Sequence, residues 1–519
     1  MRESVAASNS EVDAAWAYHN GTKHSFWSIR RNAHHLDQSI KPLGFKIYTD
    51  LPPLELPREV PPLEMPALAS IAASGEGPPG LAGPDLKALV QVLYYSAGIT
   101  KHKKYPGGEI LFRAASCTGA LYEIELYVVC GDLTDLAAGV YHFNPGDLAL
   151  RRLRAGDFRR LITSATGAEP AIAEAPVIII CSGTYWRNSW KYQSRTYRHF
   201  GWDNGTMLGN LLATAAALGL PTRLVMAFVD ETVNDLLALD TTREVAFSMV
   251  ALGRGSASQR ESPPIEPLTL NTIPLSSREV DYPAMREMHA ASSLMTADEA
   301  RQWRRDTPVP THPTATGKLI PLTPAEDEST SSEGLGAVIM RRGSTRRFDR
   351  KKAIPFEQFS TLLDRSLRGI AADFLEPTGT YLNEAYLIVH AVEGLAPGAY
   401  FLHRDQRMLE CLKEGDFRAE AGYLGLEQDL PADACFTIFL IADLQAVLER
   451  FGNRGYRAAQ LEAGIIGGKM YLAAYAQGFG ATGLTFYDDD VINFFSPHAA
   501  GKSAIFYLAF GKSAANFGF

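Results

Sequence analysis

The chain repeats itself at one fixed spacing of 259 residues. The repeated positions are Gly139, Tyr141, Leu150, Leu153, Gly156, Asp157, Phe158, Arg159, Arg195, Tyr197, Arg198, Gly205 and Asn234, each with an identical residue 259 positions later. A period this long cannot be one unit of a solenoid, so it predicts two copies of a whole domain. Two fused copies are the single-chain equivalent of a homodimer.

The composition sets broad limits on what the chain can be. Its 519 residues are enough for two domains with additional segments. The 46 % of hydrophobic and 21 % of charged residues are typical of a globular protein with a large core. A net charge of −8 argues against nucleic acid as the main partner.

The cysteines and the apolar runs predict the cellular location of the protein. The five cysteines stand singly, without metal-ligand spacing, as is usual for reduced core cysteines in the cytoplasm, and we expect no metal site. The N-terminus has no apolar segment of the kind that a signal peptide needs, and no apolar run approaches the length of a membrane span. We therefore expect a soluble cytoplasmic protein without a membrane partner.

Strand-like and helix-like segments alternate in each half, which predicts an α+β fold with three α/β/α layers. We divide the chain into an N-terminal extension (1–83), a first domain (84–260), a linker with a short helix (261–334) and a second domain (335–519). The segment 205–220 is apolar nearly all round, so we expect a buried helix in the contact between the halves. Neither GxGxxG nor GxxxxGK[ST] opens a helix, which argues against a Rossmann or P-loop nucleotide site.

The second half opens with the sequence RRGSTRRF at 341–348. Arg342 and Arg346 flank Ser344, and two guanidiniums around a hydroxyl can grip a phosphate dianion with forked hydrogen bonds. The alternative is a solvated basic turn. The corresponding stretch of the first half has no lysine or arginine between Arg58 and Lys87, a difference that a merely solvated turn does not require.

The first half has a small-residue loop, RAASCTGALY, at 113–122. Ser116, Thr118 and Gly119 would let backbone N–H groups approach a flat ligand closely. An ordinary loop before a strand is the alternative reading. The second half has Glu376 and Pro377 in this region, so the loop is not repeated.

Lys191 and Tyr192 are adjacent, and such a pair can perform acid/base chemistry because each group tunes the proton affinity of the other. A Lys-Tyr dipeptide is by itself weak evidence, since most are surface pairs. In the second copy these positions are Arg450 and Phe451, which cannot accept a proton near neutral pH. The acid/base capability therefore occurs once per chain.

These segments resemble a known family. RRGSTRRF looks like the phosphate-binding motif of flavin-dependent nitroreductases. RAASCTGALYEIELYVV, GVYHFNPGDLALRRLRAGD and WKYQSRTYR look like segments of the SagB-type dehydrogenases, a branch of that superfamily that oxidises azolines to azoles in peptide natural products. The resemblance extends over about 85–255 and 335–512, and it implies tandem nitroreductase-like domains.

The resemblance implies a site shared by both halves, because family members are intertwined dimers with FMN at the interface. By correspondence with the family motifs, the FMN-binding residues would be Arg342, Ser344 and Arg346 for the phosphate, Ser116, Thr118 and Gly119 at the isoalloxazine, Gln428 at the ring, Gly483 through its backbone and Lys512 through its charge. Lys191 and Tyr192 correspond to the catalytic pair of azoline dehydrogenases. The chain departs from the family at Ala115 and Glu123, where proline is usual.

The sequence thus predicts an intramolecular pseudo-dimer with one intact FMN site. We expect an FMN-dependent oxidoreductase that dehydrogenates an azoline-like or peptide-derived substrate by proton abstraction and hydride transfer. A nitro- or quinone-reducing enzyme supplied by a nicotinamide cofactor is the alternative, as is a degenerate flavin- or peptide-binding module. The partner would be a small molecule or a modified peptide, and further homodimerisation is possible.

Overall fold

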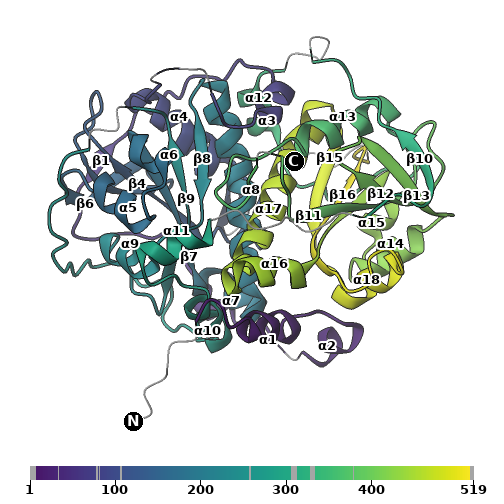
Figure 1. Ribbon diagram of the computed structural model, residues 1–519, viewed down its shortest axis with the longest axis horizontal. Coiled ribbons are helices and arrows are strands. Elements are labelled where there is room, and N and C mark those ends of the chain that lie inside the picture. The colour runs from purple at the N-terminus through teal and green to yellow at the C-terminus, as the bar shows by residue number, and fades with distance from the viewer. Residues whose placement is uncertain are drawn as a thin grey trace.

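The computed structural model describes residues 8–514, with gaps at 33, 78–79, 81, 106–107, 256–258, 305–312, 328–332 and 378. Each half is built around a seven-stranded antiparallel sheet (Figure 1). The strand order is β1-β6-β5-β4-β7-β9-β8 in the first sheet and β10-β13-β12-β11-β14-β16-β15 in the second. The two orders match position by position, so the sequence repeat is a repeat of whole folds.

The strands of the first sheet are β1 (Pro53–Glu55), β4 (Ile124–Cys130), β5 (Gly139–Asn144), β6 (Ala149–Ala155), β7 (Val177–Thr184), β8 (Thr222–Val225) and β9 (Glu244–Leu252). Those of the second are β10 (Lys318–Pro321), β11 (Asn383–Val389), β12 (Gly398–His403), β13 (Met408–Glu414), β14 (Phe436–Ala442), β15 (Gly480–Leu484) and β16 (Ser503–Gly511). The edge strands β1 and β10 come from the segments that we assigned to the extension and the linker.

The helices before the second domain are α1 (Asp13–Gly21), α2 (Phe26–Arg31), α3 (Ala67–Ala72), α4 (Leu86–Ala97), α5 (Arg159–Ala165), α6 (Pro170–Glu174), α7 (Tyr185–Tyr192), α8 (Thr196–Ala217), α9 (Asp230–Leu236), α10 (Pro283–Ala291) and α11 (Ala297–Trp303). The later ones are α12 (Leu335–Arg341), α13 (Phe356–Ser366), α14 (Arg418–Leu424), α15 (Asp429–Asp433), α16 (Leu444–Phe451), α17 (Asn453–Ala476) and α18 (Asp488–Phe495). None of the described helices has both the length and the apolar character that crossing a bilayer requires.

The first sheet separates two cores, as its sequence pattern requires. Ile178 and Ile180 of β7 pack into one apolar cluster, whereas Val177 and Ile179 pack into another. Because successive side chains of a strand point to opposite faces, every residue of this strand is buried and the strand reads as one continuous apolar run. The expected α+β fold with two tandem domains is confirmed.

The two halves meet along α8 and α17, which lie side by side at the centre of the molecule (Figure 1). A Cβ on Gly205 would lie 2.5 Å from the Cα of Gly464, so the two helix backbones touch there. A Cβ on Gly209 would lie 3.1 Å from the Cα of Gly468, one turn further along. The expectation that the helix at 205–220 lies in the contact between the halves is confirmed.

Two buried ion clusters fasten each half to the other, and they are related by the repeat. Asp488 of the second half accepts hydrogen bonds from Arg195 at 3.1 Å and Arg198 at 2.6 Å, both of the first half. Conversely, Asp230 pairs with the two repeat-related arginines of the second half, Arg454 and Arg457, at 2.6 and 2.9 Å. All of these side chains are buried, so each carboxylate depends on its guanidinium partners for its charge.

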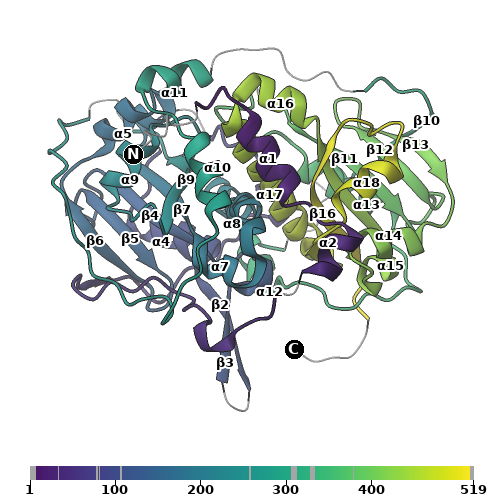
Figure 2. The ribbon, with the colours of Figure 1, turned by 90° about the horizontal axis from the view of Figure 1, so that it is seen from below.

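A hairpin of β2 (Ile99–Tyr105) and β3 (Gly108–Arg113) belongs to the first half and projects from the body of the molecule (Figure 2). In the described part of the second half, no strand pair occupies the corresponding place between α13 and β11. The hairpin explains a shift in the repeat: β4 and β11 begin 259 residues apart, whereas α4 and α13 begin 270 residues apart.

The glycine contact makes a prediction about stability. Gly205→Ala places a methyl group against the backbone of α17, which cannot move aside without separating the halves. We expect it to lower the free energy of unfolding by about 1–3 kcal/mol in urea titrations. Gly21→Ala, at the end of α1 with no atom within 4 Å of the added Cβ, is the control and should be near neutral. Equal effects of the two substitutions would contradict the proposed tight contact.

The ion clusters predict a pH dependence. Burial alone would raise the pKa of Asp488 and Asp230, but the paired guanidiniums lower it below the ordinary value. A carboxyl with a depressed folded-state pKa stabilises the fold above its unfolded pKa of about 3.9, and this stabilisation is lost as the pH falls below that value. Asp488→Asn should therefore cost about 3–5 kcal/mol at pH 7 and flatten the acid limb of the stability profile. Asp489→Asn, at an exposed carboxyl, should do neither.

Candidate active site between the halves

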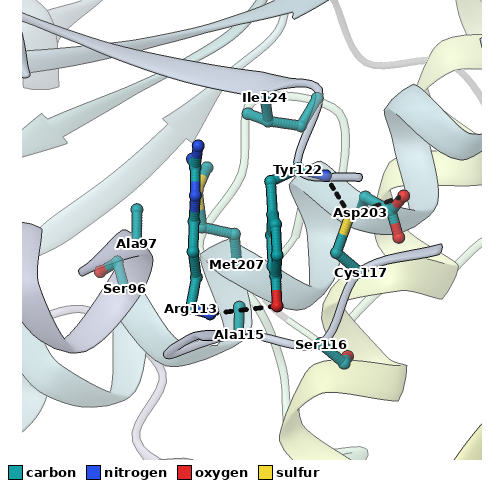
Figure 3. A pocket seen from close by; sticks show the side chains of 10 residues that line it. All are labelled: Ser96, Ala97, Arg113, Ala115, Ser116, Cys117, Tyr122, Ile124, Asp203 and Met207. Atoms are coloured by element: carbon teal, nitrogen blue, oxygen red, sulfur yellow. Dashed lines mark hydrogen bonds between the residues drawn. The ribbon is translucent and has the colours of Figure 1, made fainter. Parts of the chain in front are cut away.

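The small-residue loop of the first half borders a pocket close to α8 (Figure 3). The residues that line this pocket are Ser96, Ala97, Arg113, Ala115, Ser116, Cys117, Tyr122, Ile124, Asp203 and Met207. The Tyr122 hydroxyl accepts a hydrogen bond from the Arg113 backbone N–H at 3.0 Å, which closes the loop on itself. Burial raises the pKa of the Tyr122 phenol to about 12, so it stays protonated.

The three loop residues expected at the flavin contact two helices, α8 at Ser116 and Thr118 and the end of α7 at Gly119. Thr118 donates from its backbone N–H and its hydroxyl to one oxygen of Asp203, at 2.8 and 2.9 Å. The Ser116 carbonyl accepts from the Thr206 hydroxyl at 2.7 Å. Gly119 has a φ of +64°, and a Cβ at this position would lie 2.9 Å from the Tyr192 hydroxyl. Glycine is therefore required both for the turn and for the approach of Tyr192.

Lys191 and Tyr192 are the last two residues of α7. The contacts that hold this helix against the first half therefore also position the pair. One turn earlier, the buried Arg187 donates to the Tyr122 carbonyl at 2.9 Å and pairs with Glu125. The Lys191 ammonium lies 5.2 Å from the centroid of the Tyr192 ring. Burial, together with the charge of Arg346, lowers the pKa of Lys191. The structure thus brings the Lys-Tyr pair of the first half within electrostatic range of the RRGSTRRF motif of the second.

Arg342 follows directly on α12 and reaches into the first half. Its guanidinium donates from Nε to the Ala114 carbonyl at 3.0 Å and from Nη2 to the Arg113 carbonyl at 3.3 Å. A third N–H faces the Gly343 carbonyl at 3.4 Å. Of the five N–H groups of a guanidinium, two are left for another acceptor. These bonds tie the motif to the loop that carries Ser116.

Tyr471 of α17 joins two other expected residues. Its hydroxyl accepts from the Gly483 backbone N–H at 2.5 Å and lies 3.3 Å from the Ser344 hydroxyl. The Arg342 guanidinium lies 5.8 Å from the centre of the same ring. Ser344, Gly483 and Arg342 therefore surround one tyrosine, which sequence reasoning did not single out.

Four cations gather in this region without an anionic partner. Arg342, Arg346, Lys101 and Lys191 form no ion pair with the described residues. The Lys101 ammonium, on β2, donates to the carbonyls of Arg341 and Arg342 at 3.0 and 2.8 Å. Burial and the charge of Arg342 lower the pKa of Lys101. A group of mutually repelling cations, of which Arg342 is buried, is suited to an anion with more than one negative charge. We call this region the first junction.

Of the expected residues, Gln428 lies apart from this group and Lys512 lies at its edge. Gln428 caps α15, donates to the Gly425 carbonyl at 2.7 Å, and has no hydrogen bond to another candidate residue in the described chain. Lys512 follows β16, where its carbonyl accepts from the backbone N–H of Asp349, two positions after Arg347 of the motif. Its ammonium lies 5.6 Å from the ring centre of Phe479.

The repeat places a counterpart, the second junction, on the other side of α8 and α17, and it is built differently. At the first junction the backbone N–H of Thr345, in the motif, donates to the Ala481 carbonyl of β15. At the second junction Thr222 of β8, the counterpart of Ala481, donates from its backbone N–H to the Gly75 carbonyl at 2.7 Å. The segment around Gly75 thus occupies the motif's place but has no lysine or arginine. At the position of Tyr192 the second junction has Phe451, which is covered by Trp303 at a ring separation of 4.9 Å.

The chain's own backbone fills the second junction. Leu224, the counterpart of Gly483, donates to the Ala371 carbonyl at 2.9 Å. Asp373, the counterpart of Ala114, accepts from the backbone N–H groups of Met226 and Ala227, both at 2.9 Å. Burial raises the pKa of this carboxyl to about 6. These three backbone donors of the second junction are therefore already bonded within the chain.

Sequence reasoning missed Lys101, Tyr471 and the acidic pair Glu123 and Asp203. Lys101 could have been suspected because it lies in the hairpin that the second half lacks. Glu123 stood out as a departure from the family pattern, but its partner Asp203 is 80 positions away and gave no local signal. The Cys117 thiol and these two carboxyls place one atom each within 4.8 Å of one another.

Comparison with known proteins gives one family for both halves. The profile of the Nitroreductase family matches residues 88–254 and 339–511. A provisionally named nitroreductase of Methanocaldococcus jannaschii is 26 % identical over 169 residues, which are 33 % of this chain and 80 % of that protein. A crystal structure of a provisionally named nitroreductase from Anabaena variabilis covers 96 % of this chain and 99 % of its own, with a TM-score of 0.76 and 24 % identity. This last likeness extends over both halves and concerns the fold.

The unpaired cations predict that the first junction binds phosphate. Inorganic phosphate should raise the melting temperature relative to chloride at equal ionic strength, and a concentration of ten times Kd corresponds to about 1.4 kcal/mol. Arg346→Gln should reduce this stabilisation, because it removes a motif guanidinium without disturbing the buried Arg342. Arg350→Gln, at an exposed arginine outside the group, is the matched control. An undiminished phosphate effect in Arg346→Gln would contradict the site.

Proposed function

The chain belongs to the nitroreductase family, whose members are oxidoreductases, and from that premise we propose that it is an FMN-dependent enzyme with one flavin site per chain, at the first junction. The observation that carries this proposal is the group of four unpaired cations. A flavin mononucleotide ends in a phosphate that carries close to two negative charges at neutral pH, which this group would neutralise.

The residues present fit such a cofactor. Arg342 has two N–H groups left, and Arg346, Lys101 and the Ser344 hydroxyl add further donors around it. The loop with Ser116, Thr118 and Gly119 would border the isoalloxazine, with Gly483, Gln428 and Lys512 as further contacts. FMN, when bound, would supply the acceptor for a hydride from a substrate carbon. The phosphate would thus be held mainly by the second half and the ring mainly by the first.

Lys191 and Tyr192 are the basis on which we propose a substrate class. Dehydrogenation of a saturated C–N or C–C unit removes one hydride and one proton, so the protein must provide a proton acceptor. Lys191 suits this role because its lowered pKa leaves more of the amine neutral. Its amine would take the proton and become an ammonium, and Tyr192 would hold or orient the same substrate group. We therefore favour an azoline-like or peptide-derived substrate, as in the SagB-type branch.

The second junction supports the limit of one site. Its counterpart of the Lys-Tyr pair is Arg450 and Phe451, and the segment around Gly75 offers no cation. The Asp373 carboxyl would oppose a phosphate or a reduced flavin, because it is buried beside the backbone donors that such a ligand would need. The duplicated fold thus retains two junctions, of which one fits the cofactor.

A nitro- or quinone-reducing activity is the second candidate. It is favoured by the names of the relatives, which are provisionally called nitroreductases. That reaction requires no proton removal from a substrate carbon, so the Lys-Tyr pair distinguishes the two candidates.

The flavin content is the first test. After reconstitution and desalting, the absorption spectrum should show close to one FMN per chain. The double substitution Arg342→Ala/Arg346→Ala should weaken FMN binding by roughly 10²-fold or more, since each charge-assisted hydrogen bond contributes about 1.5–3 kcal/mol. Arg350→Ala should leave the FMN content unchanged. Two flavins per chain would contradict the single site, and no flavin would contradict the cofactor.

The acid/base pair is the second test. Lys191→Met and Tyr192→Phe should retain FMN but lower the oxidation of a thiazoline-containing model peptide by about 10²–10⁴-fold. Arg450→Met, the repeat-related position at the second junction, should turn over as the parent protein does. Full turnover of the peptide by both variants, or turnover only of a nitroaromatic with NADPH, would favour the reductase. A bound flavin that no donor reduces would indicate a degenerate binding protein.

A further inference from the structure

A buried cluster of one thiol and two carboxyls lies close to Tyr192. The Cys117 thiol lies 3.4 Å from a carboxylate oxygen of Glu123 and 3.4 Å from one of Asp203. Glu123 is completely buried and Asp203 is 6 % exposed. One oxygen of Glu123 has no hydrogen-bond donor in the described structure. These three side chains come from the loop, the residue before β4 and α8, so the fold alone brings them together.

Two buried carboxyls this close cannot both be charged without a cation, and no ion pair in the described chain reaches either of them. Burial raises the pKa of Glu123 well above its ordinary value, and the nearby Asp203 raises it further. Burial also raises the pKa of Asp203, although the two hydrogen bonds from Thr118 partly offset this. Asp203 is therefore the better place for the charge, and Glu123 the better place for a proton.

We propose that Glu123 and Asp203 share one proton near neutral pH, and that the remaining negative charge makes Tyr192 harder to deprotonate, so that Tyr192 donates a hydrogen bond while Lys191 is the base. Glu123 and Asp203 are thus positioning residues that act through Tyr192. The division of roles rests on the proposed function, whereas the shared proton does not.

The charges around Tyr192 support this division. Burial raises the pKa of the phenol, and the nearby Asp203, Cys117 and Glu123 raise it further. Arg346 acts in the opposite direction and does not outweigh them. Two further titratable neighbours in the described chain are Lys191 and His199, and the centre of the His199 ring lies 4.7 Å from that of Tyr192.

His199 does not add a charge to this balance. Burial and the charge of Arg195 lower its pKa well below the ordinary value, so the imidazole is neutral. The Cys117 pKa is raised by burial, so the cysteine remains a thiol that can donate to a carboxylate. The cluster therefore carries one negative charge, on the carboxyl pair, and this charge faces Tyr192.

The shared proton is tested on the purified protein without turnover, by infrared spectroscopy. A buried protonated carboxyl should give a carbonyl stretching band that shifts in D₂O. Glu123→Gln should remove this band, because the glutamine carries no acidic proton. Asp203→Asn should retain it, since the asparagine oxygen still accepts from Thr118 and Glu123 keeps its proton. A missing band in the parent protein, or a band that survives in Glu123→Gln, would overturn the proposal.

The effect on Tyr192 is tested by ¹⁹F NMR of protein labelled with 3-fluorotyrosine, in which Tyr192→Phe assigns the resonance. Asp203→Asn should lower the pKa of this phenol by roughly one pH unit, because the nearby charge is removed. Glu123→Gln should leave it nearly unchanged, because the charge on Asp203 remains.

Identical titrations in the two variants would overturn the role assigned to the pair. A stoichiometric metal lost in Glu123→Gln would overturn the shared proton in favour of a cation. Loss of peptide oxidation alone would concern only the proposed function.

Discussion

The close contact of α8 with α17 is the constraint on which the rest of the structure depends. Gly205 lies against Gly464, so the two helix backbones touch and the halves have little freedom to shift. This fixes Asp203 on α8 and Tyr471 on α17 relative to each other, and both face the first junction. The buried Arg–Asp clusters at Asp488 and Asp230 then fasten each half to the end of the other. A site shared between the halves requires this rigidity, because its parts come from elements on both sides.

Duplication produced two similar junctions, and their charges differ. The first junction keeps four cations that have no anionic partner among the described residues, which is unfavourable for folding in the absence of an anion. The second junction satisfies its own donors with Asp373 and covers Phe451 with Trp303, as a part of the core would. Local arrangements that cost stability are commonly retained at functional sites, where a ligand or a reaction supplies the compensation. The contrast within one chain makes that interpretation stronger than either junction would alone.

Tyr192 is affected by charges of both signs, and this connects the fold to the chemistry that we propose. The cations come mainly from the motif and the hairpin, whereas the carboxyls come from the residue before β4 and from α8. Each group changes proton affinities in the direction that a proton-removing site needs: the lysine releases its proton more easily and the tyrosine less easily. The glycine at 119 allows the phenol to approach the loop, so backbone conformation and electrostatics act on the same side chain.

The sequence by itself determined the duplicated domain, the buried helix between the halves and the segments that occur in only one copy. These are properties of spacing, apolar pattern and residue type, which are written locally along the chain. It also placed Arg342 and Ser344 in one motif, but not the tyrosine that joins Ser344 to Gly483. The pairing of Glu123 with Asp203, the approach of Lys101 to the motif and the filling of the second junction by Asp373 were decided only by the tertiary structure. Each of these brings together residues from separate elements, and a distance between elements depends on how whole faces pack, which no single segment encodes.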